Sequence, residues 1–351
     1  MSRNLVAMSG GVDSAAAMLL TKDGLGGESV GLTLALARED SPEHLVDLSN
    51  IADAAAVCRL LGAEHRQLYA YPRFSERVIA YFAKEYEAGR TPNPCVMCNR
   101  EIKFGLLAEY ADANGFDKIV TGHYARLTEF GGYTWIARAA DLTKDQSYVL
   151  AMLSQEQLRR AYFPRGGMTK AQVRELAAEH GFVSAHRKDS QDICFIPDGD
   201  YVRFLTDLTG KAPEPGDYLD PDGNVIGRHK GHLCYTIGQR KGLGIALGRH
   251  VFVLSKDASA NTVTLGDEPE LLKRTVTISG LNCPSDPAAL DGDVRCQAKL
   301  RYAHKPAEAV FHRTGTDAGI LEFTEPQRAP SPGQFAVMYA DDCVIGAGVI
   351  E

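Results

Sequence analysis

Residues 9–14, with the sequence SGGVDS, have the types and spacing of a turn that binds a phosphate group. The apolar run 5–8 precedes them and a helix-like run follows, so a buried strand leads into the first turn of a helix, whose N–H groups attract anions. The two glycines allow a sharp turn and a close approach to the anion. The serines add hydroxyl donors, and Asp13 is placed to meet a magnesium ion or to cap the helix. The stretch lacks the lysine of a Walker loop and the third glycine of a dinucleotide fingerprint.

Three cysteines form the second group with reactive chemistry. Cys95 and Cys98 lie in a CxxC spacing on a loop that contains Pro92 and Pro94 and precedes a helix-like run. Because prolines stiffen the loop and a helix N-terminus favours a thiolate, we expect a lowered pKa for Cys98. A single CxxC is weak evidence for zinc, since a structural zinc site needs four ligands. Cys194 adds a third thiol in a polar segment much later in the chain, which indicates sulfur chemistry if the three meet.

Alternating short apolar runs and helical patterns in the first half of the chain must position these residues. This alternation is typical of an α/β, doubly wound parallel sheet, with ligands at the carboxyl ends of the strands. We expect the turn at Ser9, the loop before Cys95 and the turn at residues 121–124 to open there. The expected strands are 4–8, 29–36, 64–69 and 118–121, and the expected helices are 15–21, 50–61, 74–87, 102–114, 154–161 and 169–179.

Around residues 213–217 the pattern changes to turns, glycines and short alternating strands. The spacing of the β runs after residue 274 suggests a small barrel or sandwich. We therefore expect a PP-loop-like, Rossmann-like catalytic domain over residues 1–208, a small β-rich middle domain over 209–272 and a C-terminal β-barrel-like domain over 273–351.

The composition of the chain limits the classes of protein to which it can belong. The chain has 351 residues, a net charge of −7 and eight cysteines, and neither a membrane span nor a secretory leader is visible, so we expect a cytoplasmic protein with free thiols.

The segment 223–256 contains no Asp or Glu. Two interpretations stay open for it: a phosphate-binding face or a solvated loop. Its basic residues are Arg228, Lys230, Arg240, Lys241, Arg249 and Lys256, joined by His229, His232 and His250.

Several motifs in one order resemble those of the bacterial tRNA-specific 2-thiouridylases, a family of PP-loop ATP pyrophosphatases. They are the glycine turn, the TPNPCVMCN loop with the following IKF, and residues 121–124, 144–148, 189–195 and 235–244. The resemblance implies that ATP adenylates the C2 oxygen of uridine 34, the wobble base of certain tRNAs, and that pyrophosphate leaves. A cysteine persulfide then delivers sulfur to C2. It also implies tRNA and a sulfur donor, a cysteine desulfurase or a sulfur-relay protein, as partners, and ATP with Mg²⁺ as cofactors.

The resemblance also implies residue roles. Cys98 is expected as the catalytic nucleophile and Cys194 as the persulfide carrier. The residues expected at ATP are Ala7, Met8, Ser9, Gly10, Gly11, Val12, Asp13, Ser14, Leu34 and Gly122. The residues expected at the target base or elsewhere on tRNA are Asn93, Pro94, Cys95, Lys144, Asp145, Gln146, Arg301 and Tyr302.

Two departures from the family pattern keep alternatives open. Cys95 stands where many members carry an aspartate, and Leu34 replaces a methionine usual beside the nucleotide. Cys95, Cys98 and Cys194 also match the demand of a [4Fe–4S] cluster, which three thiolates hold with one iron open. Two further alternatives are another PP-loop enzyme that adenylates a small molecule and a tRNA-binding protein without catalysis. The cysteine motifs argue against the first, and the intact glycine turn with Cys98 and Cys194 argues against the second.

Overall fold

The computed structural model of the chain describes residues 2–41, 43–182 and 193–351. Its N-terminal part contains a five-stranded, fully parallel sheet in the order β3-β2-β1-β4-β7. The strands are β1 (Arg3–Ala7), β2 (Glu28–Ala35), β3 (Glu64–Tyr69), β4 (Lys118–Val120) and β7 (Ala161–Tyr162). The order reverses on either side of β1, which places the ligand crevice of such a sheet at the carboxyl end of β1. The doubly wound fold expected from the sequence is confirmed.

Helices cover both faces of this sheet because its central strands, β1 and β2, are buried on both sides. Leu5 and Leu32 pack on one face against residues of α6, α7 and α8, and Val6 and Met8 pack on the other against α1, α2 and α9. The helices are α1 (Val12–Gly24), α2 (Glu43–Leu60), α6 (Leu107–Asn114), α7 (Ser147–Leu150), α8 (Gln155–Arg160) and α9 (Lys170–Glu179). The left-handed Gly115 (φ +69°) ends α6, as its sequence position predicts.

Two helical runs expected to be continuous are each built from shorter pieces. The first consists of α3 (Tyr71–Phe74), the π-helical turn η1 (Ser75–Ile79) and α4 (Ala80–Glu87). The second consists of α5 (Pro94–Cys98), the π-helical segment η2 (Asn99–Leu106) and α6. Wider π-helical turns of this kind are frequent at functional sites.

Three strands of the first half were not expected. The hairpin of β5 (Arg126–Phe130) and β6 (Tyr133–Ala137) turns at Gly131 and Gly132, which both have positive φ. A Gly-Gly pair between two apolar runs is a hairpin signal, so this hairpin was detectable. Residue 161, expected to end a helix, instead begins β7, which has only two residues and therefore no readable periodicity.

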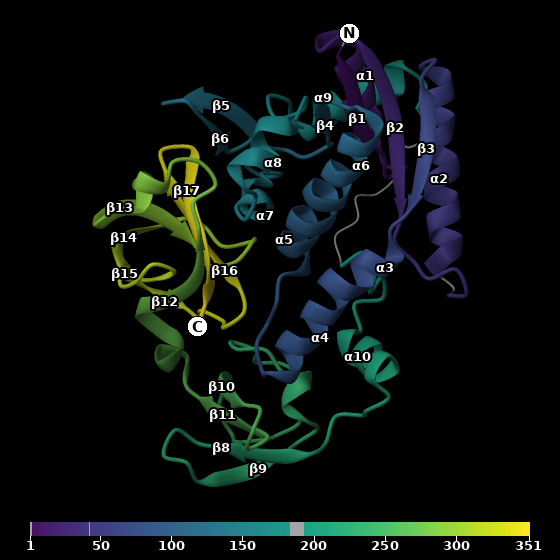
Figure 1. Cartoon of the computed structure of the whole chain (residues 1–351). Helices are drawn as coiled ribbons and strands as arrows, with labels where there is room; N and C mark the ends of the chain where they lie inside the picture. The colour runs from purple at the N-terminus through teal and green to yellow at the C-terminus, as the bar shows by residue number, and fades with distance from the viewer. Residues whose placement is uncertain (1, 42, 183–192) are drawn as a thin grey trace.

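The middle part of the chain forms a small sheet in the order β10-β11-β8-β9 with its own core around Tyr218 and Val253. Its elements are β8 (Gly216–Leu219), β9 (Val225–His229), η4 (His232–Cys234), β10 (Phe252–Asp257) and β11 (Thr262–Gly266). The preceding helix α10 (Tyr201–Thr209) packs through Phe204 and Leu205 on Phe82 of α4. Figure 1 shows this sheet at the opposite end of the molecule from the N-terminus.

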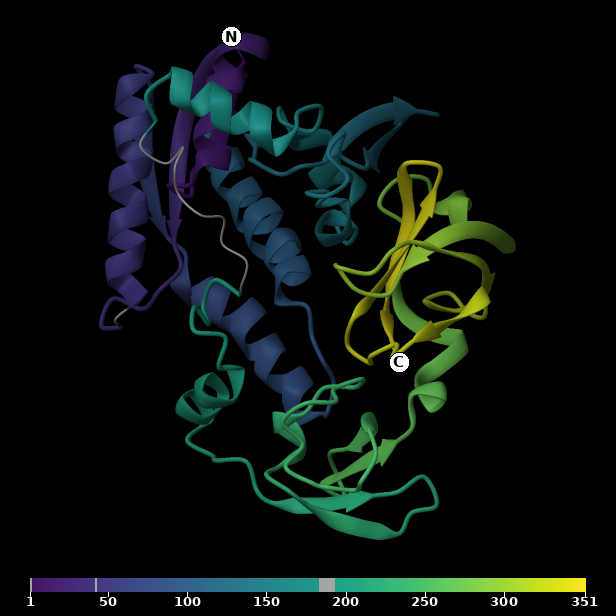
Figure 2. The same ribbon diagram turned by 180° about the vertical axis from the view of Figure 1, so that it is seen from behind.

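The C-terminal part is a closed barrel, which decides between the barrel and the sandwich left open by the sequence. Its six strands follow the order β12-β15-β14-β13-β16-β17, and β17 pairs back with β12. Through Cys343 and Ala137, β17 also pairs with β6, so the hairpin extends the barrel sheet. The elements are η5 (Glu268–Leu271), β12 (Leu272–Asn282), η6 (Pro287–Leu290), β13 (Asp293–Lys299), β14 (Ala307–Arg313), β15 (Ala318–Arg328), β16 (Phe335–Ala340) and β17 (Cys343–Ile350). Figure 2 shows the barrel beside the parallel-sheet domain, with the middle sheet joining them at one end.

Among the described residues, none of the helices is both long and apolar enough to span a bilayer.

Candidate active site

The glycine turn between β1 and α1 is tightly built. Gly10 has φ +71°, and a Cβ there would lie 2.7 Å from the backbone oxygen of Asn50. A Cβ at Gly122, after β4, would lie 2.8 Å from the backbone carbonyl of Asp13. Ser14 Oγ accepts a hydrogen bond from Ser9 N (3.1 Å) and donates one to Gly11 O (3.0 Å). Ser14 therefore holds the backbone of the turn in place. The ends of β1 and β4 lie so close together that only glycine fits at residue 122.

Asp13 lies in the first turn of α1 and holds two cations. Its Oδ1 accepts hydrogen bonds from Lys170 Nζ (2.8 Å), Tyr124 OH (3.2 Å) and the guanidinium of Arg165. Arg165 is fully buried, and its guanidinium carbon lies 4.0 Å from the centroid of the Tyr124 ring. One carboxylate with two cations leaves an excess positive charge beside the glycine turn, which favours a bound anion.

The remaining guanidinium atoms of Arg165, Nε and Nη2, are buried without a hydrogen-bond partner in the described part of the chain. Buried donors of this kind are costly unless a ligand or water satisfies them. The sequence motifs did not identify Arg165 or Lys170, because both lie far along the chain from the glycine turn. Lys170 and Arg165 both contact the same oxygen, Oδ1, of the Asp13 carboxylate.

Both thiols of the CxxC loop lie on the short helix α5. Asn93 caps this helix by accepting a hydrogen bond from Val96 N (3.4 Å), and Pro94 occupies its first position. Cys95 is exposed near the N-terminus of α5, whereas Cys98 is buried at its last residue. The expected helix N-terminus effect on Cys98 is therefore wrong. Burial instead raises the pKa of Cys98 to about 12, with Lys103 partly opposing the rise.

The structure brings the three cysteines together. Loss of hydration raises the pKa of Cys194, and the nearby Cys95 thiol raises it further. The pKa of Cys98 is raised in the same way by both of the other thiols. Cys98, Leu34 and Phe195, which follows Cys194, belong to one apolar cluster. Within the described residues, no group of three His, Cys, Asp or Glu side chains is arranged to hold a metal ion. Asp189 and Asp192, in the motif before Cys194, lie outside the described residues.

Lys103 is the cation that these thiols share. Its charge opposes the rise in the pKa of Cys95, Cys98 and Cys194. Lys103 follows Cys98 by five residues within η2, and a π-helical turn joins residues five apart, which brings the two onto one side of the helix. The sequence contained this lysine in the IKF motif, but nothing in the motif indicated its role.

His123 connects the thiols to the glycine turn. It is buried after β4, and Nδ1 lies 2.6 Å from Thr121 Oγ1 in a hydrogen bond. Burial holds the pKa of His123 well below its usual range, and the charges of Lys103 and Arg165 lower it further. The pKa of His123 thus responds both to Lys103 of the thiol cluster and to Arg165 beside the glycine turn.

The residues expected at the target base lie in the loop before α7. Gln146 Oε1 accepts from Tyr124 N (2.8 Å), and Gln146 N donates to Tyr124 O (2.8 Å). Asp145 is buried, and it accepts hydrogen bonds from Ala139 N (3.0 Å) and Ser147 Oγ (2.7 Å). The Asp145 carboxylate therefore shapes this loop from inside. Lys144 is half-buried in the same loop.

Tyr302 lies in the loop after β13 of the barrel and faces the catalytic domain. Its ring makes an edge contact with Tyr148 of α7 at 6.1 Å between centroids. Loss of hydration raises the pKa of Tyr302, and the nearby Asp145 and Cys95 raise it further. Arg301 donates to the backbone oxygen of Arg328 (3.4 Å). The barrel thus places an aromatic side chain, 43% exposed, next to the thiol loop.

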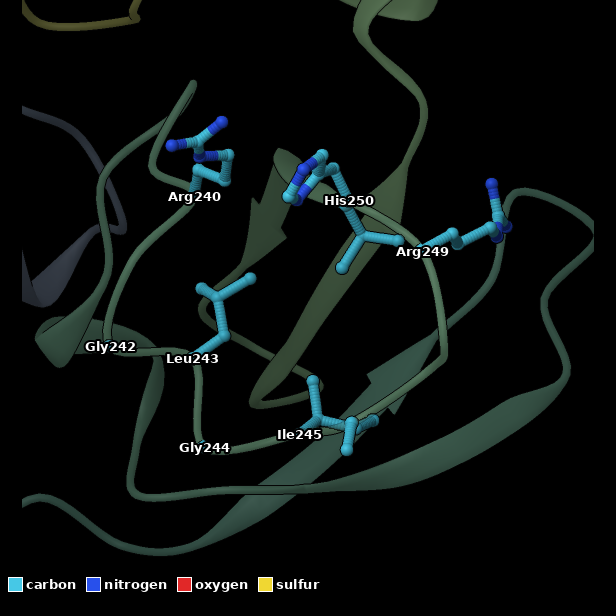
Figure 3. Close-up of a pocket in the computed structure, with 9 residues that line it drawn as sticks. Arg240, Gly242, Leu243, Gly244, Ile245, Arg249 and His250 are labelled. Carbon is cyan, nitrogen blue, oxygen red and sulfur yellow. The ribbon is translucent and has the colours of Figure 1, made fainter.

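The acid-free segment surrounds a hollow in the middle part of the chain, with a cavity of about 440 Å³. Figure 3 shows Arg240 and His250 above Leu243, with the side chain of Arg249 directed away from them. Not all of the segment's charge is free, because Arg249 pairs with Asp267 and Arg228 pairs with Asp217. Lys256 is directed inward and donates to Tyr235 O (2.9 Å).

Comparisons with known proteins cover almost the whole chain. Three family models match: a tRNA methyl transferase HUP domain over residues 2–198, a tRNA methyl transferase PRC-barrel domain over 203–267 and an aminomethyltransferase beta-barrel domain over 273–350. The chain is 44% identical over 359 residues to the tRNA-specific 2-thiouridylase MnmA of Treponema denticola, covering 99% of this chain and 97% of that protein. It is also 44% identical over 357 residues to the MnmA of Heliobacterium modesticaldum, covering 99% and 91%. The MnmA of Moorella thermoacetica is 43% identical over 355 residues, with 99% of each chain covered.

The open side of Gly11 predicts a specific loss of anion binding. A Cβ at Gly11 would meet only Ser9 Oγ, at 3.5 Å, so Gly11→Val is expected to fold normally but to block the approach of phosphates. Isothermal titration with ATP should show an affinity reduced by about tenfold or more, equivalent to about 1.4 kcal/mol. Gly315→Ala, where nothing lies within 4 Å, is the matched glycine control. Wild-type ATP affinity in Gly11→Val would contradict this use of the turn.

The raised thiol pKa predicts slow alkylation that depends steeply on pH. Because only the thiolate reacts and the pKa of Cys98 is about 12, its iodoacetamide labelling should rise about tenfold per pH unit from pH 7 to 10. Peptide mass mapping reports Cys98 and Cys194 separately. A free cysteine peptide, with a pKa of about 8.5, should level off within this range. Labelling of Cys98 that reaches its plateau below pH 8 would indicate a lowered pKa instead.

Proposed function

The chain belongs to the tRNA-specific 2-thiouridylase family, and from this premise we propose that it uses ATP to form 2-thiouridine at the wobble position of tRNA. The observation that carries the proposal is that the glycine turn follows β1 while Cys98 packs with Leu34 at the end of the neighbouring parallel strand β2, with Phe195, which follows Cys194, in the same cluster. The family models have methyl transferase names, but this pairing matches the needs of thiolation. One part binds the phosphates that activate an oxygen, and the other delivers sulfur.

The first half-reaction is adenylation. The C2 oxygen of uridine attacks the α-phosphorus of ATP, the bond to the β-phosphate breaks, and pyrophosphate leaves with the electron pair. The net positive charge of the Asp13, Arg165 and Lys170 cluster supports a role in holding the phosphates. We propose that Mg²⁺ enters with ATP on the phosphate oxygens. The carboxylate of Asp13, held by two cations, then serves to orient Arg165 and Lys170.

The second half-reaction transfers sulfur. The outer sulfur of a persulfide on Cys194 attacks C2, and AMP leaves with the C2 oxygen. Cys98 then attacks the Cys194 sulfur, so that the inner S–S bond breaks, a Cys98–Cys194 disulfide forms and the thiocarbonyl remains on the base. A thiol reductant must restore both cysteines before the next turnover. Lys103, whose charge reaches all three thiols, stabilises the negative sulfur species during these steps.

The surfaces around the site support the assignment of tRNA as the macromolecular substrate. A stacked wobble base must leave the anticodon loop to be modified, so contacts beyond the catalytic domain are needed. Tyr302 of the barrel provides an aromatic face beside Cys95, and the Nε2 group of Gln146 is a donor for a uracil edge. Arg240 and His250 at the hollow of the middle part are suited to backbone phosphates. We propose that a cysteine desulfurase or a sulfur-relay protein loads the exposed Cys194.

The cluster alternative differs in its use of the same cysteines. Cys95, Cys98 and Cys194 lie near one another, but among the residues described they are not arranged as a metal-ligand set. We therefore propose the persulfide route for these cysteines.

The roles of the three thiols are separable by substitution. Cys98→Ala and Cys194→Ala should each abolish thiolation, measured by mass spectrometry of tRNA nucleosides after incubation with ATP, Mg²⁺ and a persulfide donor, a cysteine desulfurase with its cysteine substrate. Both variants should bind ATP with unchanged affinity, because neither side chain belongs to the glycine turn. Cys95→Asp should keep activity, and Cys234→Ser, in the middle part of the chain, is the control for a thiol outside the site. Full thiolation by Cys194→Ala would refute the persulfide role of this residue.

A further inference from the structure

A turn of the C-terminal barrel, residues 331–334, is hydrogen-bonded to the loop that leads into the thiol helix. Gln334 Nε2 donates to Thr91 O (2.9 Å) and to Pro92 O (3.2 Å). In the opposite direction, Thr91 N donates to Pro332 O (2.7 Å). Figure 1 shows the connection from α4 to α5 passing beside the barrel near the C-terminus. The barrel turn thus makes three hydrogen bonds to the backbone just before Asn93.

The end of the chain reinforces the same contact. Arg90 donates to Glu351 Oε2 (2.6 Å) and to Ile350 O (3.1 Å), while Glu85 of α4 accepts from Arg90 Nε (2.8 Å). Gly333 has φ +89°, and a Cβ there would lie 3.0 Å from both Arg90 Cβ and Thr91 N. Ile350 N in turn donates to Gln334 O (2.8 Å). The last strand and the 331–334 turn therefore hold residues 90–92 as one unit.

The loop depends on hydrogen bonds from the barrel because its own sequence offers few backbone donors to hold it in place. Pro94 has no N–H group, so it cannot donate to the Thr91 carbonyl in a local turn, and Gln334 Nε2 instead donates to the carbonyls of Thr91 and Pro92. The helix that follows begins with α5 and continues directly through η2 into α6, so the loop meets the N-terminal turn of a longer helical run. Asn93 caps this turn, and residues 90–93 therefore help to set the direction of the Cys95 side chain in it.

We propose that Gln334 is a positioning residue of the active site, which fixes the thiol loop by satisfying the carbonyls of Thr91 and Pro92. The C-terminal barrel then completes the catalytic site as well as contributing Tyr302 to its border. This inference rests on the proposed function for its consequence in catalysis, but the contact itself is independent of any reaction. A misplacement of about 1 Å at a reacting group costs on the order of 100-fold in rate.

The test compares Gln334→Glu and Gln334→Ala with Asn282→Ala. Glutamate has the shape of glutamine but cannot donate its side-chain hydrogen bonds to the two carbonyls. Asn282 is the matched control, since its Nδ2 also joins the barrel to two backbone oxygens of the catalytic domain, Ala151 O (2.8 Å) and Leu153 O (3.1 Å), away from the thiol loop.

Both Gln334 variants should lower kcat for thiolation by about 10- to 100-fold, with KM for tRNA and ATP affinity within about twofold of wild type. Iodoacetamide labelling of Cys95 and Cys98 should become several-fold faster as the loop loosens, while Asn282→Ala should resemble wild type in both measurements. Wild-type kcat and labelling in Gln334→Glu, or equal losses in Asn282→Ala, would overturn the positioning role. If the wild-type protein does not thiolate tRNA, the proposed function fails, and the labelling comparison still tests the clamp.

Discussion

The chemistry of this protein depends on the common direction of the strands in its parallel sheet. Strands that run the same way end at the same edge, so the glycine turn after β1 and His123 after β4 meet there although they are far apart in sequence. The two strand ends lie so close together that any side chain at Gly122 would collide with the backbone of Asp13 at the start of α1. The anion site and the thiol site therefore lie next to each other at the carboxyl end of the parallel sheet.

Burial has opposite effects on the charged groups gathered there. It raises the pKa of the thiols and lowers the pKa of His123, so the resting site keeps both neutral at physiological pH. Two cations of this edge, Arg165 and Lys170, form ion pairs with Asp13. Neutral thiols are oxidised more slowly than thiolates, because the thiolate is the reactive form. The charge of Lys103 opposes the rise in the pKa of all three thiols.

The sequence predicted well those features that a local pattern encodes. The glycine turn and the alternation of strands and helices are short-range signals, and the parallel sheet follows from them. The CxxC pair was expected on a loop but lies on the helix α5. The groups that complete the site, namely Arg165, Lys170 and Gln334, lack such a signal because their roles arise from contacts made only in the folded chain. The pKa of Cys98 was misjudged for a related reason. Its position at the end of α5, and its burial, follow from packing against Ile102 and Phe74 rather than from the loop sequence.

The central claim is that sulfur passes from Cys194 to the wobble uridine at this edge without a metal cluster. The most direct measurement is a single turnover with iron-free protein carrying an isotopically labelled persulfide on Cys194, mixed with tRNA and ATP and followed by nucleoside mass spectrometry. We expect the label to appear in 2-thiouridine in an amount close to that of the loaded protein, and only when ATP is present. Absence of transfer from the loaded protein, together with thiolation after reconstitution with iron and sulfide, would contradict the account and assign Cys95, Cys98 and Cys194 to a cluster.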